Sequence, residues 1–256
     1  MNEELSKARR FLSRRADFHP ILVGLTGSHY YGFPSPDSDL DLKGIHVAPL
    51  ESIISLDPPE ETIDETAVFE GQEIDFTSHE LALALRLLLK GNGNILERIL
   101  TPYQAVETNL RAKLVALAIR SISRRYFHHY RGFFGQKCRD YESAAVKTVK
   151  DLLYVYRSAL TGIHLLATGE LVGDVTVLTP RYGFPHVLNL VEAKRSGGEH
   201  GVLDATLDRF SEDRERLEVL LTDAHERSPL PEQPPNAKEL SSFLVATRLD
   251  MAGLHP

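Results

Sequence analysis

Apolar and polar positions alternate along the first third of the chain in the way that β-strands require. Residues 21–27, ILVGLTG, form an apolar run that is typical of a buried strand, and residues 40–47, LDLKGIHV, alternate between apolar and charged side chains. A third stretch, residues 67–78, alternates in the same way around Gly71 and Gln72. The pattern therefore predicts a buried strand, a half-buried strand and a β-hairpin.

Most of the remaining chain shows the spacing of apolar residues that amphipathic helices have. The predicted helices cover residues 2–16, 79–90, 97–100, 109–133, 141–168, 203–227 and 237–252. A proline-rich linker, residues 228–235, precedes the last of them. Strands early in the chain and helices later predict an α+β fold, in which a small mixed-sheet lobe, residues 1–104, is followed by an all-helical lobe, residues 105–256.

The composition is that of a globular protein. The chain has 256 residues, of which 42% are hydrophobic and 25% are charged, so it is long enough for a sizeable core. A single cysteine, Cys138, excludes an internal disulfide framework. The sequence shows neither a signal peptide nor an apolar run long enough for a bilayer. These features predict a soluble, cytoplasmic protein without a membrane partner.

The charge is distributed unevenly. The whole chain has a formal net charge of -7, but residues 111–157 contain eleven Lys or Arg against three Asp or Glu, which is a net charge of +8. We therefore expect this segment to face an anionic ligand, although the average charge alone would argue against a polyanion.

Three aspartates are the candidate metal ligands. Asp39 and Asp41 are two positions apart in a predicted strand, so their side chains point to the same face, about 6.6 to 7 Å apart. Asp75 can project from a neighbouring strand toward the same place, and Glu73 on the same face is an alternative third acid. Carboxylates this close need a compensating cation, for which a pair of divalent metal ions is well suited. The alternative is an exposed strand edge whose charges discourage aggregation.

The dipeptide Gly27-Ser28 is a candidate phosphate site. A glycine at the end of a strand lets backbone N–H groups approach a phosphate closely, and the serine hydroxyl adds a donor. For Ser28 the other reading, a helix N-cap, is compatible with phosphate binding. Neither this dipeptide nor the Asp-x-Asp triplet is specific alone, but their order along the chain is much more so.

Taken together, the motifs resemble those of the nucleotidyltransferase superfamily typified by DNA polymerase beta. The stretch GSHYYGFPSPDSDLDLKGIHV, followed by EIDFTSHEL and LLKGNGNILERIL, is similar to the RNA-repair-pathway, RNA-ligase-associated subfamily. The later stretch KDLLYVYRSALTGIHLLATGEL also resembles it, and the likeness extends over residues 23–249. One departure is GNGN, residues 91–94, where the subfamily often has GNPN.

The resemblance implies a function for each motif. Gly27 and Ser28 would hold a nucleoside triphosphate, Asp39 and Asp41 would bind two Mg²⁺ or Mn²⁺ ions, and Asp75 would bind the ion that activates the acceptor hydroxyl. The resemblance also places further nucleotide-binding residues at Lys43, Lys150, Tyr154 and Arg157. It further implies a functional association with an RNA ligase.

The spacing of the last three residues agrees with such a role. Lys150, Tyr154 and Arg157 fall at i, i+4 and i+7, which is one face of a helix. Cations on this face would orient the leaving pyrophosphate. The alternative is a solvated face that makes ordinary ion pairs.

A second basic run interleaves arginines with aromatic residues. Arg124, Arg125, Tyr126 and Arg131 lie in RSISRRYFHHYRGFFGQK, and such a mixture suits the phosphates and splayed bases of RNA. A helix with an aromatic core stripe and a charged outer face explains the run equally well.

The sequence therefore predicts a metal-dependent nucleotidyltransferase that transfers a nucleoside monophosphate from a nucleoside triphosphate to a hydroxyl, most readily one at an RNA end. Two alternatives stay open. The acceptor could be a protein or a small molecule, as in antitoxin-like or adenylylating enzymes, because one catalytic lobe serves many acceptors. The chain could also be a catalytically silent nucleic-acid-binding module. The presence of all three candidate acids argues against this alternative, because the loss of one would have favoured it.

Overall fold

A computed structural model describes residues 1–15, 18–198 and 201–254, which form two compact units. We call Met1–Thr26, Asp39–Ser121 and Pro234–Pro256 the sheet unit, and Gly27–Ser38 with Ile122–Gln233 the helical unit. Within the described ranges, none of the helices has both the length and the apolar character needed to cross a bilayer.

The sheet unit contains a five-stranded sheet in the order β3-β4-β2-β1-β5. The strands are β1 (Pro20–Leu25), β2 (Leu40–His46), β3 (Thr62–Phe69), β4 (Gln72–Glu80) and β5 (Gln104–Glu107). Strands β2 and β4 pair in parallel and the other neighbours are antiparallel, so the sheet is mixed, as predicted. The predicted hairpin is the β3–β4 pair, whose turn places Glu70 and Gly71 at φ values of 50° and 77°.

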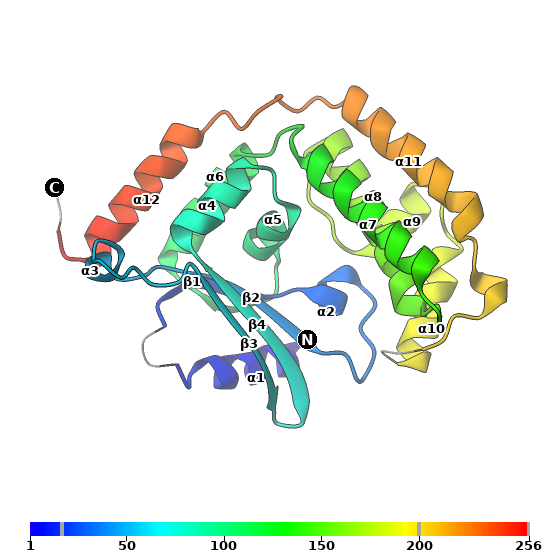
Figure 1. Ribbon diagram of the computed structural model, residues 1–256, viewed down its shortest axis with the longest axis horizontal. Helices are drawn as coiled ribbons and strands as arrows, with labels where there is room; N and C mark the ends of the chain where they lie inside the picture. Colours follow the sequence, from blue (N-terminus) through cyan, green and yellow to red (C-terminus); the bar gives the residue numbers. More distant parts are fainter. Residues whose placement is uncertain (16–17, 199–200, 255–256) are drawn as a thin grey trace. The chain divides into compact units, whose positions relative to one another are not determined.

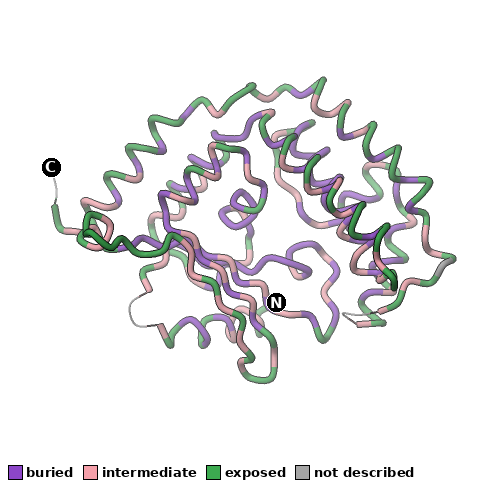
Figure 2. The backbone as a smooth tube through the Cα atoms, in the orientation of Figure 1, coloured by how far each residue is buried: buried purple, intermediate pink, exposed green. Residues whose placement is uncertain are grey.

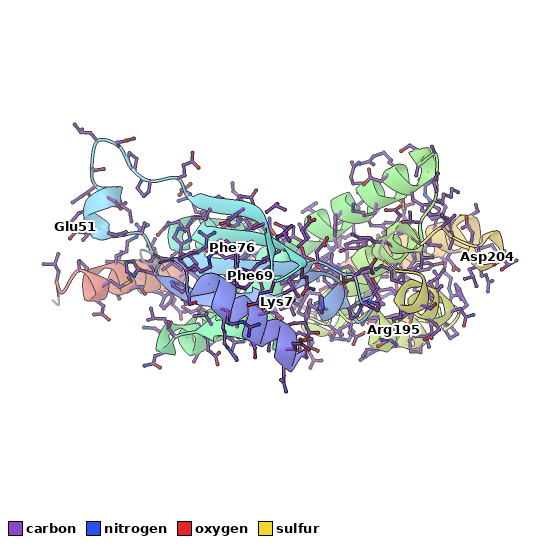
Figure 3. All side chains as sticks on the ribbon, turned by 90° about the horizontal axis from the view of Figure 1, so that it is seen from below. Lys7, Glu51, Phe69, Phe76, Arg195 and Asp204 are labelled. Atoms are coloured by element: carbon purple, nitrogen blue, oxygen red, sulfur yellow. The ribbon has the colours of Figure 1, made fainter. Side chains whose placement is uncertain are left out.

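Helix α1 (Asn2–Leu12) covers one face of this sheet. Its Phe11 ring lies 5.7 Å from the Phe69 ring and 6.2 Å from the Phe76 ring, and Figure 3 shows Phe69 and Phe76 beside Lys7 of α1. Helices α4 (Leu81–Leu89), α5 (Gly93–Leu100) and α6 (Asn109–Arg120) contact the strands from the opposite side (Figure 1). Alternate strand residues are thus buried against α1, which turns the polar residues between them away from it.

The unit boundary differs from the predicted division at residues 104/105. Strand β5 crosses that point and pairs with β1, and α6 and α12 (Ala237–Met251) also belong to the sheet unit. Helix α12 contacts α4 and the short α3 (Leu50–Ile53), and Arg248 of α12 lies 3.0 Å from Glu80. The helical pattern of α12 was predicted correctly, but its periodicity does not reveal which unit buries its apolar face.

The helical unit is built around α8. Its elements are α2 (Gly27–Tyr31), α7 (Tyr126–Ser143), α8 (Val149–Thr168), α9 (Val175–Arg181), α10 (Val187–Gly197), a 3₁₀ turn (Ala205–Leu207) and α11 (Phe210–Glu226). Fifteen of the twenty residues of α8 are buried, which identifies it as the core helix of this unit (Figure 2). The predicted helix over residues 109–133 is instead two helices, α6 and α7, and α9 and α10 were not predicted.

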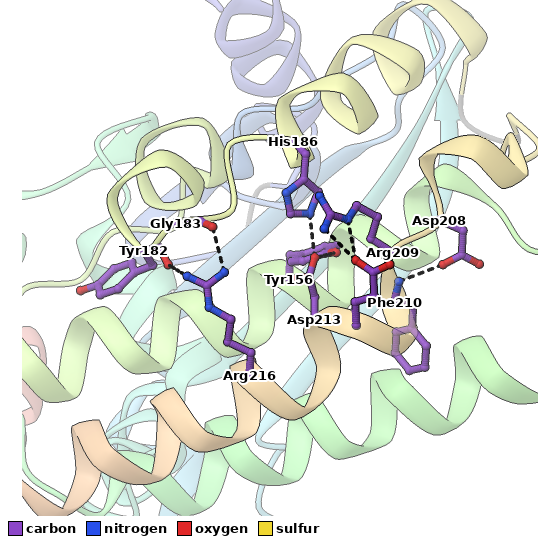
Figure 4. Close-up of polar contacts among 10 residues, drawn as sticks. Tyr156, Tyr182, Gly183, His186, Asp208, Arg209, Phe210, Asp213 and Arg216 are labelled. Carbon is purple, nitrogen blue, oxygen red and sulfur yellow. Dashed lines mark hydrogen bonds and ion pairs between the residues drawn. The ribbon is translucent and has the colours of Figure 1, made fainter.

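A polar cluster joins three helices of this unit (Figure 4). The Asp213 carboxylate on α11 is 5% exposed. It accepts a 2.6 Å hydrogen bond from the Tyr156 hydroxyl of α8 and lies 2.6 Å from Nε2 of His186 next to α10. Burial, together with Asp213, raises the pKa of Tyr156. The phenol therefore stays protonated and satisfies the buried acceptor.

Gly162 makes a testable contribution to the packing of this unit. A Cβ at this position of α8 would lie 2.5 Å from the Tyr130 Cβ and 3.2 Å from the Leu221 Cδ1. We expect Gly162→Ala to lower the free energy of unfolding by about 1–3 kcal/mol, because α7 must move away. Urea unfolding followed by circular dichroism measures this. Gly197→Ala, where the added Cβ would meet no atom of the other described residues outside its own helix backbone within 4 Å, is the matched control. Equal losses in both variants would contradict the packing argument.

Candidate active site

Two of the predicted metal ligands lie side by side in the sheet. The parallel register of β2 and β4 pairs Asp41 with Asp75, as it pairs Leu42 with Phe76. Because Leu42 and Phe76 belong to the core against α1, the two aspartates project from the other face. Their side chains are 29% and 42% exposed, and Asp39, directly before β2, is half-buried. The sequence predicted that Asp41 and Asp75 share a face, and they do.

Lys43 supplies positive charge between these carboxylates. Its Nζ lies 2.8 Å from Oδ2 of Asp75 and 3.9 Å from Oδ1 of Asp41. It also donates a 3.2 Å hydrogen bond to the Thr77 hydroxyl, and its side chain is 20% exposed. His79 lies two residues after Thr77 on the same face of β4, and burial lowers its pKa to about 4. Lys43 rather than His79 therefore provides charge compensation here at neutral pH.

The same face carries an acid that the sequence analysis missed. Asp64 on β3 is paired in register with Thr77 and accepts a 2.8 Å hydrogen bond from its hydroxyl. Thr77 thus connects Lys43 to Asp64. The alternation in TIDETAVF, residues 62–69, was the available signal, but the predicted hairpin began only at residue 67 and so left out Asp64. Glu73, the alternative third acid, is exposed and precedes Asp75 by two positions on β4.

The residues of this face fit a divalent cation. Among the described residues, no group of three or more His, Cys, Asp and Glu side chains is arranged to hold a metal ion. The donor set is nevertheless that of a hard cation, because it consists of carboxylate oxygens. The Lys43 ammonium stands where positive charge is needed between Asp41 and Asp75. A metal ion could take over this function if Lys43 moved aside.

The predicted phosphate-binding dipeptide begins the helical unit. Gly27 has a φ of +60°, a left-handed conformation that favours glycine, and it starts α2. Ser28 is 6% exposed, and its carbonyl oxygen accepts a 3.1 Å hydrogen bond from the Phe33 amide. The chain leaves β1 through Thr26 immediately before this dipeptide, and the Thr26 amide donates a 2.9 Å hydrogen bond to the Asp41 carbonyl oxygen.

The predicted nucleotide-binding face of α8 packs against the segment around α2. The Arg157 guanidinium lies 3.8 Å from the centre of the Tyr31 ring, and Arg157 is 1% exposed. The Tyr154 ring lies 5.8 Å from the rings of both Tyr31 and Phe33, in edge-to-face contact. Lys150, one turn earlier, is half-buried. For Arg157, the alternative of a solvated face is therefore wrong.

The basic, aromatic run does not form a single exposed surface. Tyr126 is fully buried, so the prediction that its ring stacks on a base is wrong, because it belongs to the core. Arg124 lies 2.7 Å from Glu232 and donates a 2.7 Å hydrogen bond to the Ser228 carbonyl oxygen. Arg125 and Arg131 are exposed. The alternative of an aromatic core stripe with a charged outer face describes this run better.

Comparisons with known proteins found a family model, two relatives and a solved structure that are similar to this chain. Residues 1–246 match the model of the RNA repair pathway DNA polymerase beta family. An uncharacterized protein of Methanocaldococcus jannaschii is 32% identical over 155 residues, which are 60% of this chain and 63% of that protein. An uncharacterized protein of Bacillus subtilis is 28% identical over 215 residues, 76% of this chain and 80% of that protein.

The solved structure is that of a nucleotidyltransferase-like protein from Exiguobacterium sibiricum. The alignment covers 98% of this chain and 89% of that protein, with 15% sequence identity and a TM-score of 0.33.

Proposed function

This chain belongs to the RNA repair pathway DNA polymerase beta family, and on that premise we propose that it is a metal-dependent nucleotidyltransferase. The reaction moves a nucleoside monophosphate from a nucleoside triphosphate to a hydroxyl at an RNA end. The observation that carries the proposal is the register of β2 and β4, which sets Asp41 beside Asp75 on a polar face of the sheet. Two paired carboxylates supply the oxygen ligands that a metal-dependent phosphoryl-transfer site requires.

The acidic residues have one task in this proposal. Asp39, Asp41 and Asp75 would hold the two Mg²⁺ or Mn²⁺ ions, which would lower the pKa of the acceptor hydroxyl and stabilise charge on the phosphoryl oxygens. Asp75 rather than Glu73 is the third ligand, because Asp75 is the residue paired in register with Asp41. Lys43 neutralises this pair in the absence of metal, and its ammonium would contact the nucleotide when metal ions are bound to the aspartates.

The residues of the helical unit bind the nucleotide. The triphosphate accepts hydrogen bonds from the Gly27 and Ser28 amides and from the Ser28 hydroxyl. The Lys150 ammonium stabilises the negative charge of the departing pyrophosphate. Arg157 and Tyr154 pack on Tyr31 and Phe33. They therefore fix the segment that carries Gly27 and Ser28, in addition to any contact of their own with the nucleotide.

The chemical step is a single displacement. The acceptor oxygen forms a bond to the α-phosphorus as the bond from that phosphorus to the bridging oxygen of the β-phosphate breaks. The acceptor proton goes to solvent and pyrophosphate leaves. RNA is the proposed acceptor because of the family to which the chain belongs, and an RNA ligase that seals the modified end is the proposed functional partner.

Incubation of the purified protein with each α-labelled nucleoside triphosphate, Mg²⁺ or Mn²⁺ and a mixed RNA pool tests this function. We expect label in RNA, with one or more preferred bases, and none when metal is removed with EDTA. Label in the protein or in a small molecule instead would mean that the acceptor is not RNA but a protein or a small molecule. No transfer to any of them would leave the nucleic-acid-binding module as the function.

A further inference from the structure

A cavity of about 520 Å³ lies between α7 and α11, wholly within the helical unit. Its lining includes buried apolar side chains, Phe134, Cys138 and Leu221, and exposed charged ones at the surface. None of the residues assigned above to metal or nucleotide binding lines it. Its volume falls in the range of ligand-binding sites.

Two glycines of α7 help to create the hollow. Gly132 and Gly135 lie within an 18-residue helix, where glycine is less favourable than alanine. Apart from the backbone of its own helix, a Cβ at Gly132 would meet no atom of the described residues within 4 Å, and one at Gly135 would lie 3.5 Å from the Arg139 Nη1. At Gly162, by contrast, the missing side chain makes room for Tyr130 of the same unit. The space beside Gly132 is not used by any described neighbour.

Three arginines surround the cavity, with one glutamate, Glu218, among the lining residues. Arg139 donates a 2.6 Å hydrogen bond to the Gln136 side chain, and Arg214 forms an ion pair with Glu142. The Arg131 guanidinium lies 5.7 Å from the centre of the Phe127 ring. All three arginines are exposed, so each keeps guanidinium N–H groups at the surface for a ligand. The lining therefore favours an anion.

We propose that this cavity binds single-stranded RNA, with a phosphate held by Arg131, Arg139 and Arg214 and the adjoining sugar lying over Gly132. Guanidinium groups recognise phosphate through paired hydrogen bonds. An RNA strand fits better than a free nucleotide because the arginines are exposed, which lets the ligand continue past the cavity. The identity of the ligand rests on the proposed function, in which RNA is the acceptor, whereas the position of the site does not.

Fluorescence anisotropy of a labelled single-stranded oligoribonucleotide, measured in EDTA without nucleotide, tests the site apart from catalysis. We expect the Arg131→Gln/Arg139→Gln double variant to bind about tenfold more weakly than wild type and, because one phosphate contact is lost, to lower the slope of log affinity against log salt by about 0.7. The double variant Arg181→Gln/Arg227→Gln removes equal charge from exposed positions of the same unit outside the lining. It should bind almost as wild type does.

A second variant separates shape from charge. Gly132→Leu fills the hollow without changing charge and should weaken RNA binding about as much as the arginine variant, while Gly197→Leu, at another open helical glycine, should not. Unchanged RNA affinity in the arginine variant and Gly132→Leu, or no RNA binding by the wild type, would overturn the proposal. A free nucleotide that binds while RNA does not would also overturn it. Asp41→Asn should bind RNA as wild type does, because the binding test needs neither metal nor catalysis. Loss of nucleotidyl transfer would therefore not affect the result of the binding test.

Discussion

Asp41→Asn is expected to lower the rate of nucleotidyl transfer at least about a thousandfold, which corresponds to roughly 4 kcal/mol of transition-state stabilisation. The amide keeps the shape of the side chain, but it removes the negative charge that a bound metal ion requires. Single-turnover incorporation of an α-labelled nucleoside triphosphate into RNA measures the loss.

The pairing of β2 with β4 supplies the controls for this variant. Asp75→Asn should lose activity to a similar extent, because Asp75 is paired in register with Asp41. Glu73→Gln, an exposed change two residues earlier on β4, should retain most of the activity. An active Asp41→Asn enzyme would refute the assignment of the site, and an inactive Glu73→Gln enzyme would move the third ligand from Asp75 to Glu73.

Lys43→Met is expected to act in opposite directions on the metal-free and metal-bound protein. Without metal, two carboxylates lose the cation that lies 2.8 and 3.9 Å away, so the melting temperature should fall slightly, since the ion pairs are partly exposed. With metal, the competing ammonium is gone, and Mn²⁺ should bind about tenfold more tightly, because like charges at such distances repel by a few kcal/mol.

Thermal melting with and without Mn²⁺ and calorimetric titration measure these two effects. Lys43→Arg keeps the positive charge and should resemble the wild type in both. If Lys43→Met bound Mn²⁺ no more tightly than wild type, Lys43 would not occupy the place of a metal ion. If Lys43→Met also raised the KM for the nucleotide and affected kcat less, that result would show that Lys43 contacts the nucleotide in addition to its effect on metal binding.

The local parts of the fold and site could be predicted from the sequence. Period-two alternation identified β2, β4 and the end of β3 that leads into the hairpin, and it placed Asp41 and Asp75 on polar faces of their strands. The family resemblance of the motifs was confirmed by the match over residues 1–246. These features depend on side chains a few positions apart, whose pattern the sequence displays directly.

Features that depend on distant contacts could not be predicted. Tyr126 and Arg131 have similar neighbours in the sequence, yet one is fully buried and the other exposed, because the packing of the helical unit decides which face is covered. Helix α9 was missed because Pro180 lies within it and Gly183 follows it, and both residues normally indicate a turn. The membership of β5 and α12 in the sheet unit likewise follows from tertiary pairing.

The most direct test of the metal site is a count of bound ions. Mn²⁺ binding, followed by electron paramagnetic resonance in the presence of a non-hydrolysable nucleoside triphosphate analogue, should give two ions per wild-type chain. The same titration of Asp41→Asn, corrected for ions bound by the free nucleotide, should give fewer. Equal numbers in the two proteins would contradict the claim that the paired strands β2 and β4 form the metal site.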